Sequence, residues 1–278
     1  MGVNTKHKSS VFSTLFSSPD TLRELYSAIK DIDIPQNAII DINTLSDVLF
    51  MGQINDVSFT IDNRIVVLAE HQSTICENVP CRLLMYIGRV YEKIIDREKL
   101  YQKNLVKIPT PEFIVLYNGK DKYPDYKELR LSDAFKEEYD FPTLELVVKI
   151  YNINQGRNPE IQEKSKNLED YSFFIGKIRD FNKKLTLDES VNKAVKYCIE
   201  HNILKQFLLT HASEIINMLF EEISIEEIVA VRSKEAREEG IQEGREKTAR
   251  NALAEGVSIS LIQKITGLDM AIIENLRN

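Results

Sequence analysis

One short segment restricts the fold of this chain more than any other. Residues 57–61 alternate apolar with polar side chains, which is the pattern of a strand buried on one face. Asp62 and Asn63 then supply turn chemistry, and the apolar run 64–69 follows directly. Two strands with so short a connection pair antiparallel, so the segment predicts a β-hairpin.

Helices and further strands flank the predicted hairpin. Residue spacing predicts helices over 10–17, 21–29 and 80–95 and strands over 113–117 and 144–153. Pro19 and Pro80 stand where a proline can start a helix, and from about Pro159 onward the pattern is helical throughout. This order predicts an α/β fold with a mixed β-sheet flanked by helices, followed by an all-helical C-terminal region.

The chain is long enough to bury a full core, with 278 residues and 43% hydrophobic content. We expect three parts. Residues 1–156 should form the core that contains the sheet, and 157–231 a helical region packed on or beside it. Residues 232–278 should form a charged helix and a tail resembling a helix-turn-helix unit.

The expected tail lies at 258–276, where apolar residues give two faces around Gly267. These residues are Ile259, Ile262, Ile265, Leu268, Ile272, Ile273 and Leu276. The stretch from Arg232 to Arg250 before it is highly charged, and Gly240 and Gly244 each weaken a helix by about 1 kcal/mol relative to alanine. Such a helix is expected to be mobile or held by another chain, and we favour a homodimer or higher homo-oligomer formed through the C-terminal half.

Composition excludes several classes of protein. The net charge of −7 argues against nonspecific coating of nucleic acid, although the basic residues in 82–107 could form one local patch or a solvated helix face. The three cysteines lack zinc-site spacing, and we expect buried or idle thiols. No run reaches the roughly 18 apolar residues of a membrane helix, so we expect a cytoplasmic protein with no membrane partner.

Polar residues at the end of the second hairpin strand suggest a site. Glu70, His71 and Gln72 follow the apolar run, and Asp56 begins the preceding strand. Two carboxylates on neighbouring strands can bind a divalent cation through hard oxygen ligands, and a cation-bound water can attack a phosphodiester. Polar residues at strand ends are also common without any catalytic role. His71 alternates away from Glu70, which favours a core histidine over a general base.

Hairpin register decides whether the two carboxylates can meet. If Asp62 and Asn63 form a two-residue turn, Asp56 pairs with Ala69 and Glu70 faces away from Asp56. A three-residue connection or a β-bulge would bring the two acids together. The sequence leaves both possibilities open.

Several segments, in this order and at these spacings, resemble the recombination-promoting nuclease (Rpn) family, a transposase-like family of the PD-(D/E)XK nuclease superfamily. The segments are VFSTLFSS, NDVSF, EHQSTICENVPCRLLMYIGRVYE, KIPTPEFIVLYNGK and LSDAF. The resemblance covers nearly the whole chain. It implies a restriction-endonuclease-like core and a DNA endonuclease associated with recombination or mobile elements.

The resemblance also implies roles for individual residues. Asp56 and Glu70 would bind Mg²⁺, or another divalent cation such as Mn²⁺. Gln72 would take the place of the superfamily lysine that orients the attacking water. DNA would be the partner, and Arg82 and Tyr86, one helical turn apart, are weaker candidates for contacts with its phosphates.

Two departures from the family pattern support an alternative function. Gln72 is neutral and cannot supply the charge of a lysine. Ser9, in KSSVF, stands where related sequences often carry an aspartate. The alternative is a catalytically weakened or inactive nuclease-fold protein that acts as a DNA-binding or assembly module.

Overall fold

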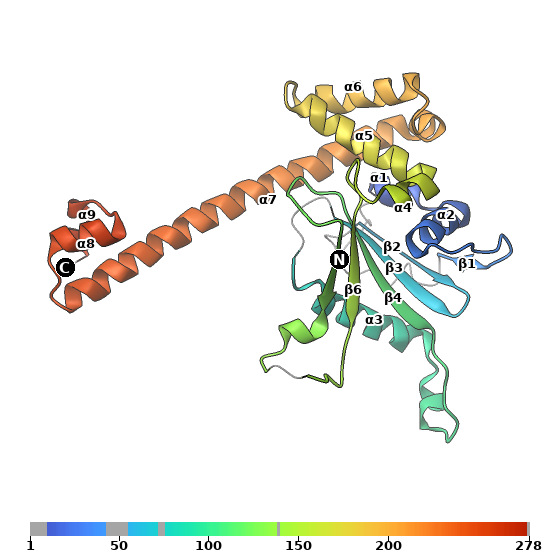
Figure 1. Ribbon diagram of the computed structural model, residues 1–278, viewed down its shortest axis with the longest axis horizontal. Coiled ribbons are helices and arrows are strands. Elements are labelled where there is room, and N and C mark those ends of the chain that lie inside the picture. Colours follow the sequence, from blue (N-terminus) through green and yellow to red (C-terminus); the bar gives the residue numbers. More distant parts are fainter. Residues whose placement is uncertain (1–9, 43–54, 72–75, 138–139, 277–278) are drawn as a thin grey trace, which may run out of the picture. The chain divides into compact units, whose positions relative to one another are not determined.

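A mixed β-sheet forms the centre of the first part of the chain (Figure 1). The computed structural model describes residues 10–42, 55–71, 76–137 and 140–276, and at 55–56, 68–71, 220–239 and 271 it describes the backbone alone. Within these residues six strands lie in the order β1-β2-β3-β4-β6-β5. The strands are β1 (Ile40–Asp41), β2 (Asn55–Ile61), β3 (Arg64–His71), β4 (Thr110–Tyr117), β5 (Tyr126–Arg130) and β6 (Val147–Asn152).

Strand pairing confirms the predicted fold class. β3, β4 and β6 are parallel neighbours, whereas β1, β2 and β5 each join the sheet antiparallel. β1 and β5 were not expected from the sequence. β1 has only two residues, and β5 reads YKELR, in which one buried leucine stands among polar and charged residues. Short edge strands of this composition carry no clear alternation.

The β2–β3 hairpin has the two-residue turn. Ile61 pairs with Arg64, and the ladder continues without interruption to the Asn55–Glu70 pair. Asp62 adopts a left-handed φ of 50°, a conformation that aspartate tolerates better than most residues. Of the two registers that the sequence allowed, the structure therefore has the one without a bulge.

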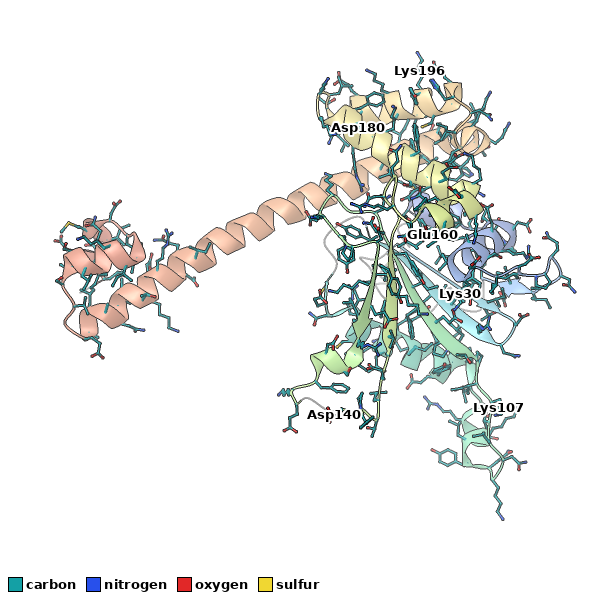
Figure 2. All side chains as sticks on the ribbon, viewed as in Figure 1. Lys30, Lys107, Asp140, Glu160, Asp180 and Lys196 are labelled. Atoms are coloured by element: carbon teal, nitrogen blue, oxygen red, sulfur yellow. The ribbon has the colours of Figure 1, made fainter. Side chains whose placement is uncertain are left out.

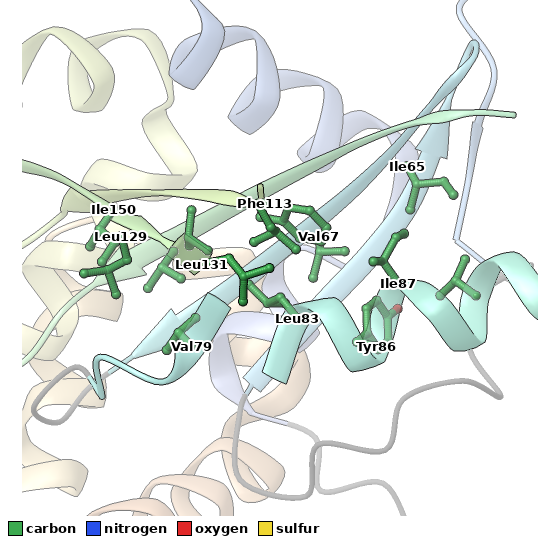
Figure 3. Close-up of a cluster of buried hydrophobic side chains, with 14 of the residues drawn as sticks. Ile65, Val67, Val79, Leu83, Tyr86, Ile87, Phe113, Leu129, Leu131 and Ile150 are labelled. Atoms are coloured by element: carbon green, nitrogen blue, oxygen red, sulfur yellow. The ribbon is translucent and has the colours of Figure 1, made fainter. Parts of the chain in front are cut away.

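Helix α3 (Val79–Ile94) covers one face of the sheet (Figure 3). Its buried side chains, which include Leu83 and Ile87, pack on Ile65 and Val67 of β3. Pro80 lies in the first turn, as predicted. The 3₁₀ turns Arg97–Tyr101 (η2) and Leu131–Ala134 (η3) follow α3 and β5, respectively.

A second group of helices lies on the other side of the sheet, where the first two pack on its strands and the others pack on helices of the same group (Figure 1). These are α1 (Val11–Leu15), α2 (Pro19–Lys30), α4 (Pro159–Lys164), α5 (Lys166–Asn182) and α6 (Leu187–Glu200). The Ser18 side chain caps α2 immediately before Pro19, which confirms the predicted start. The Tyr26 ring meets Phe59 of β2 edge-on at 5.9 Å, and its hydroxyl donates to Glu112 of β4 at 2.9 Å.

The chain divides into two compact units, 1–220 and 221–278. Helix α7 (Lys205–Ala254) begins in the first unit, has non-helical dihedrals at His211, and ends in the second. The second unit also contains α8 (Ile259–Thr266) and α9 (Met270–Asn275). None of the helices in the described ranges is both long and apolar enough to span a membrane.

The predicted tail exists, with one correction to its core. Gly267 ends α8 with a left-handed φ of 70°, and Ile262 and Ile273 are buried on either side of it. Ile265 and Ile272, which we expected on the apolar faces, are instead 64% and 36% exposed. The end of α7 supplies Ala249 to the same cluster, so a third helix takes the place of those two residues. The oligomer expected through the C-terminal half stays a prediction.

The glycines of the second unit provide a matched test of its stability. Gly267→Ala should destabilise the unit by about 1 kcal/mol, because a side chain at φ 70° is strained even with open space around it. Gly240→Ala should stabilise α7 by about 1 kcal/mol, because that glycine is helical and nothing would contact the added methyl group. Hydrogen exchange of α7 and α8 peptides in the full chain measures both changes. Equal effects of the two substitutions would contradict the assignment of Gly267 as a helix cap.

The cysteines should differ in reactivity. Cys198 is buried in α6, and burial raises the pKa of its thiol to about 11, whereas Cys76 is exposed. In a thiol-titration assay of native protein at pH 8, Cys76 should react quickly and Cys198 only after denaturation. Cys76→Ser should remove the fast phase alone. A fast phase that persists in this variant and disappears in Cys198→Ser would contradict the assignment.

Candidate active site

The candidate site lies at the end of the hairpin remote from its turn. Asn55 pairs with Glu70, and Asp56 pairs with Ala69, so the two predicted acids occupy successive pairs of the ladder. Their side chains, and all of Gln72 and Ser9, lie outside the described part of the structure. The predicted roles of these residues therefore stay predictions.

The faces of the hairpin can be assigned from the described residues next to these positions. Ser58 of β2 contacts α3, and alternation places position 56 on that same face. Val66 of β3 pairs with Phe59 beneath α2, and alternation places position 70 on this opposite face. In the regular ladder, the positions of Asp56 and Glu70 do not share a face.

Helix α3 brings Tyr86 to the face that contains position 56. The Tyr86 hydroxyl donates to the Ser58 hydroxyl at 2.8 Å, and the side chain is 3% exposed. Figure 3 shows Tyr86 on the side of α3 that faces the sheet. Arg82, one turn earlier, is half-buried at the border of the helix face that packs on the sheet. Tyr86 thus links α3 to β2 two residues from Asp56, and the phosphate contacts predicted for Arg82 and Tyr86 stay predictions.

Polar residues stand at the ends of the three parallel strands. His71 of β3 aligns with Tyr117 of β4, which in turn aligns with Asn152 of β6. The carboxyl ends of parallel strands are where α/β proteins commonly bind ligands. Tyr117 and Asn152, however, are buried, and their side chains donate to the backbone carbonyl oxygens of Asp121 and Tyr123, so they support this edge of the sheet.

Asn118, directly after β4, is the centre of this polar edge. Arg179 of α5 donates to its backbone carbonyl and, at 3.3 Å, to its side-chain oxygen, and also donates to Asn154 at 2.9 Å. Asn118 is 1% exposed, and its side-chain Nδ2 has no hydrogen-bond partner in the described structure. A buried donor without a partner costs roughly 1–3 kcal/mol.

Tyr117 closes the edge from the α3 side. Its hydroxyl donates to the Asp121 carbonyl oxygen at 2.9 Å, and burial, with a smaller contribution from the Asp121 charge, raises the pKa of the phenol. The ring also lies against Gly119, where an added Cβ would come within 2.5 Å of it. Tyr117 is therefore a neutral packing residue, and the glycine is required by this close approach.

The described side chains do not form a metal site by themselves. Within the described ranges no group of three or more His, Cys, Asp or Glu residues is arranged to bind a metal ion. Any cation at this end of the hairpin would depend on Asp56 and Glu70, which supply suitable oxygen ligands but, in this register, from opposite faces. The regular ladder does not fit one cation shared by both acids.

Comparison with known proteins identifies the family. The model of the family described as "Putative transposase, YhgA-like" matches residues 17–193, which include the whole sheet and the first half of α6. The chain belongs to this transposase family. The match agrees with the resemblance inferred from the sequence, and no curated protein or solved structure matches the chain.

The sequence of this transposase-family protein predicts the hairpin but not the polar edge around Asn118. The residue pair Asn118-Gly119 indicates only a turn, and Arg179 carried no signal, because 61 residues separate it from Asn118. Only the packing of α5 against the end of β4 brings the two together. No motif in the sequence could have indicated that contact.

Arg179 should stabilise the edge measurably. Arg179→Met removes the donors to Asn118 and Asn154 and leaves buried acceptors without a partner, so the free energy of unfolding should fall by about 2 kcal/mol. Lys183→Met is a matched control, because Lys183 pairs only with exposed Asp180 at 2.8 Å, and it should change stability by less than about 0.5 kcal/mol. Urea denaturation followed by circular dichroism measures both values. Similar losses in the two variants would contradict an anchoring role for Arg179.

Proposed function

We propose that this protein is a DNA endonuclease of the transposase family that depends on a divalent cation, Mg²⁺ or Mn²⁺. The supporting observation is the combination of family membership with Asp56 and Glu70 at one end of a hairpin in a mixed sheet. Mobile-element proteins act on DNA, and two carboxylates with a nearby amide suit phosphodiester hydrolysis. Asp56, Glu70 and Gln72 are the residues proposed to be needed for cleavage.

The ligand type of the two acids favours a bound divalent cation, whereas the register of the hairpin does not. Carboxylates are the ligands that Mg²⁺ and Mn²⁺ prefer, and a bound cation would activate water and offset phosphate charge. The described ladder separates the two acids onto opposite faces. A one-residue shift at its last two pairs would place both acids on one face, where they could share a cation.

The other residues of the site have roles that do not require the cation. Gln72 can donate and accept hydrogen bonds, so it would orient water or a phosphate without adding positive charge. Tyr86 holds α3 against β2 through Ser58, which keeps the helix in place beside the Asp56 position. Arg179 holds Asn118 in place at the end of β4, the strand next to β3.

Conservative substitutions test the two acids. Asp56→Asn and Glu70→Gln should each reduce nicking of supercoiled plasmid DNA with Mg²⁺ by about 100-fold or more, because either change removes an anionic oxygen ligand. Asp62→Asn is the matched control, since Asp62 is an exposed carboxylate in the turn of the same hairpin. Its activity should equal that of the wild type.

The assay also includes a metal-free arm. EDTA should abolish nicking by the wild type, and circular dichroism checks that each variant is folded. Equal nicking by the wild type, Asp56→Asn and Glu70→Gln would rule out these acids as the catalytic residues.

A lysine at position 72 tests how the site differs from the wider superfamily. Gln72→Lys should maintain or raise the nicking rate, because it restores a positive charge beside the attacked phosphate. Gln72→Ala should lower the rate while leaving DNA affinity within about twofold. A Gln72→Lys variant no more active than Gln72→Ala would show that position 72 has no part in catalysis.

The second candidate function is a noncatalytic DNA-binding or assembly module on a nuclease fold. It is favoured by the uninterrupted register, which leaves the acid positions on opposite faces, and by the neutral Gln72. Purified protein that binds DNA but does not nick it with either Mg²⁺ or Mn²⁺ would establish this alternative.

A further inference from the structure

Helices α5 and α6 carry a row of aromatic and basic side chains that neither the core nor the candidate site uses. On α5 the row follows four-residue spacing, and on α6 it does the same, so each half lies on one side of its helix. Its members are Phe173, Lys177 and Phe181 on α5 and Lys193, Tyr197 and His201 at and after α6. We call this set the aromatic–lysine stripe.

The stripe is continuous across the two helices. Tyr197 lies at its centre, with its ring centroid 3.9 Å from that of His201 and 6.3 Å from that of Phe173. Both of these ring pairs are stacked, with interplanar angles of 16° and 21°, respectively. Phe181 meets the Tyr197 ring edge-on at 6.5 Å and extends the stripe along α5.

Two lysines are held directly over these rings. Lys177 Nζ lies 4.3 Å from the centroid of Tyr197 and 5.5 Å from that of Phe173. Lys193 Nζ lies 4.8 Å from the centroid of Phe181. Cation–π contacts of this kind localise positive charge on the aromatic surface.

The stripe is not needed to fill the core between the helices. That core consists of other residues, including Phe174 and Ile178 of α5 and Val191 of α6, which are almost fully buried. Every member of the stripe is at least partly exposed. The stripe contains no carboxylate, and its neighbour Asp180 already pairs with Lys183 at 2.8 Å.

We propose that the aromatic–lysine stripe is a binding surface for single-stranded DNA. The rings are partly exposed, and a base can stack on a ring face without regard to sequence once the flexible lysine over that face moves to a phosphate. A duplex hides its base faces, so it would engage the lysines alone. DNA is the polymer on which a transposase-family protein acts.

The proposal goes beyond the endonuclease function and does not require the acids of the hairpin. Arg179 faces Asn118 from α5, whereas Lys177, two residues earlier, lies over the Tyr197 ring of α6. The two surfaces of α5 are therefore distinct. Binding measured in EDTA tests the stripe alone, and nicking measured with Mg²⁺ tests the hairpin alone, so failure of one proposal can be separated from failure of the other.

The experiment measures fluorescence anisotropy of a dye-labelled oligothymidylate with the full chain in EDTA. Tyr197→Leu and Phe181→Leu should each weaken binding by about tenfold, the loss of one stacked base. Tyr197→Phe retains the ring and should bind like the wild type. Thermal unfolding of each variant is recorded, so that weaker binding can be attributed to the lost ring only where the fold is unchanged.

Charge variants test the lysines independently of the rings. Lys177→Gln and Lys193→Gln should each reduce the slope of log affinity against log salt by about 0.7, the value for one phosphate contact on a single strand. Lys107→Gln is the control, because this exposed lysine follows η2, far from α5 and α6 (Figure 2), and its slope should be unchanged. These exposed or half-exposed substitutions provide the test even if Tyr197→Leu does not fold.

Several results would overturn the proposal. Affinity and salt slope that are unchanged in the ring and lysine variants would show that the stripe does not bind the strand. Tighter binding of a duplex or of oligouridylate RNA would contradict the assignment to single-stranded DNA. If Tyr197→Leu converts an oligomer to a monomer in light scattering without loss of DNA affinity, the stripe is an interface between copies of this chain.

Discussion

Strand β3 is the element on which the rest of the structure depends, because it is paired on both edges and covered on both faces. Ile65 and Val67 pack against α3, while Val66 is buried on the side of α2. A slip of one residue would reverse these faces, so the register is held by packing as well as by the two-residue turn. The same register determines where Asp56 and Glu70 lie, and the chemistry of the hairpin is subject to this constraint.

The constraint explains why the site cannot be understood from the motif alone. An acid followed by a glutamate and a glutamine is compatible with a nuclease, yet the regular ladder gives the two acids different faces. Either the last pairs rearrange when the protein acts, or the fold is retained for binding rather than cleavage. Family membership supports a role with DNA in both cases.

Helix α5 connects the sheet with the outer helices. Arg179 on one side of it holds Asn118 at the end of β4, and Lys177 on another side lies over the ring of Tyr197. The first contact joins residues that are remote in sequence and stabilises the polar edge. The second contact belongs to the aromatic–lysine stripe, which the core does not need. The rings and lysines of the stripe together have the chemistry of a surface that binds single-stranded DNA.

Residue patterns by themselves determined the mixed sheet, the hairpin, helix α3 and the two short C-terminal helices, because each has strong local periodicity or a clear turn. Alternation and the turn at Asp62 also limited the hairpin to two registers. Only the tertiary structure decided between these registers, placed β5 at the edge and joined Arg179 to Asn118. It also showed that the end of α7 replaces Ile265 and Ile272 in the C-terminal cluster. These outcomes depend on contacts between residues far apart in the chain, and local spacing carries no information about them.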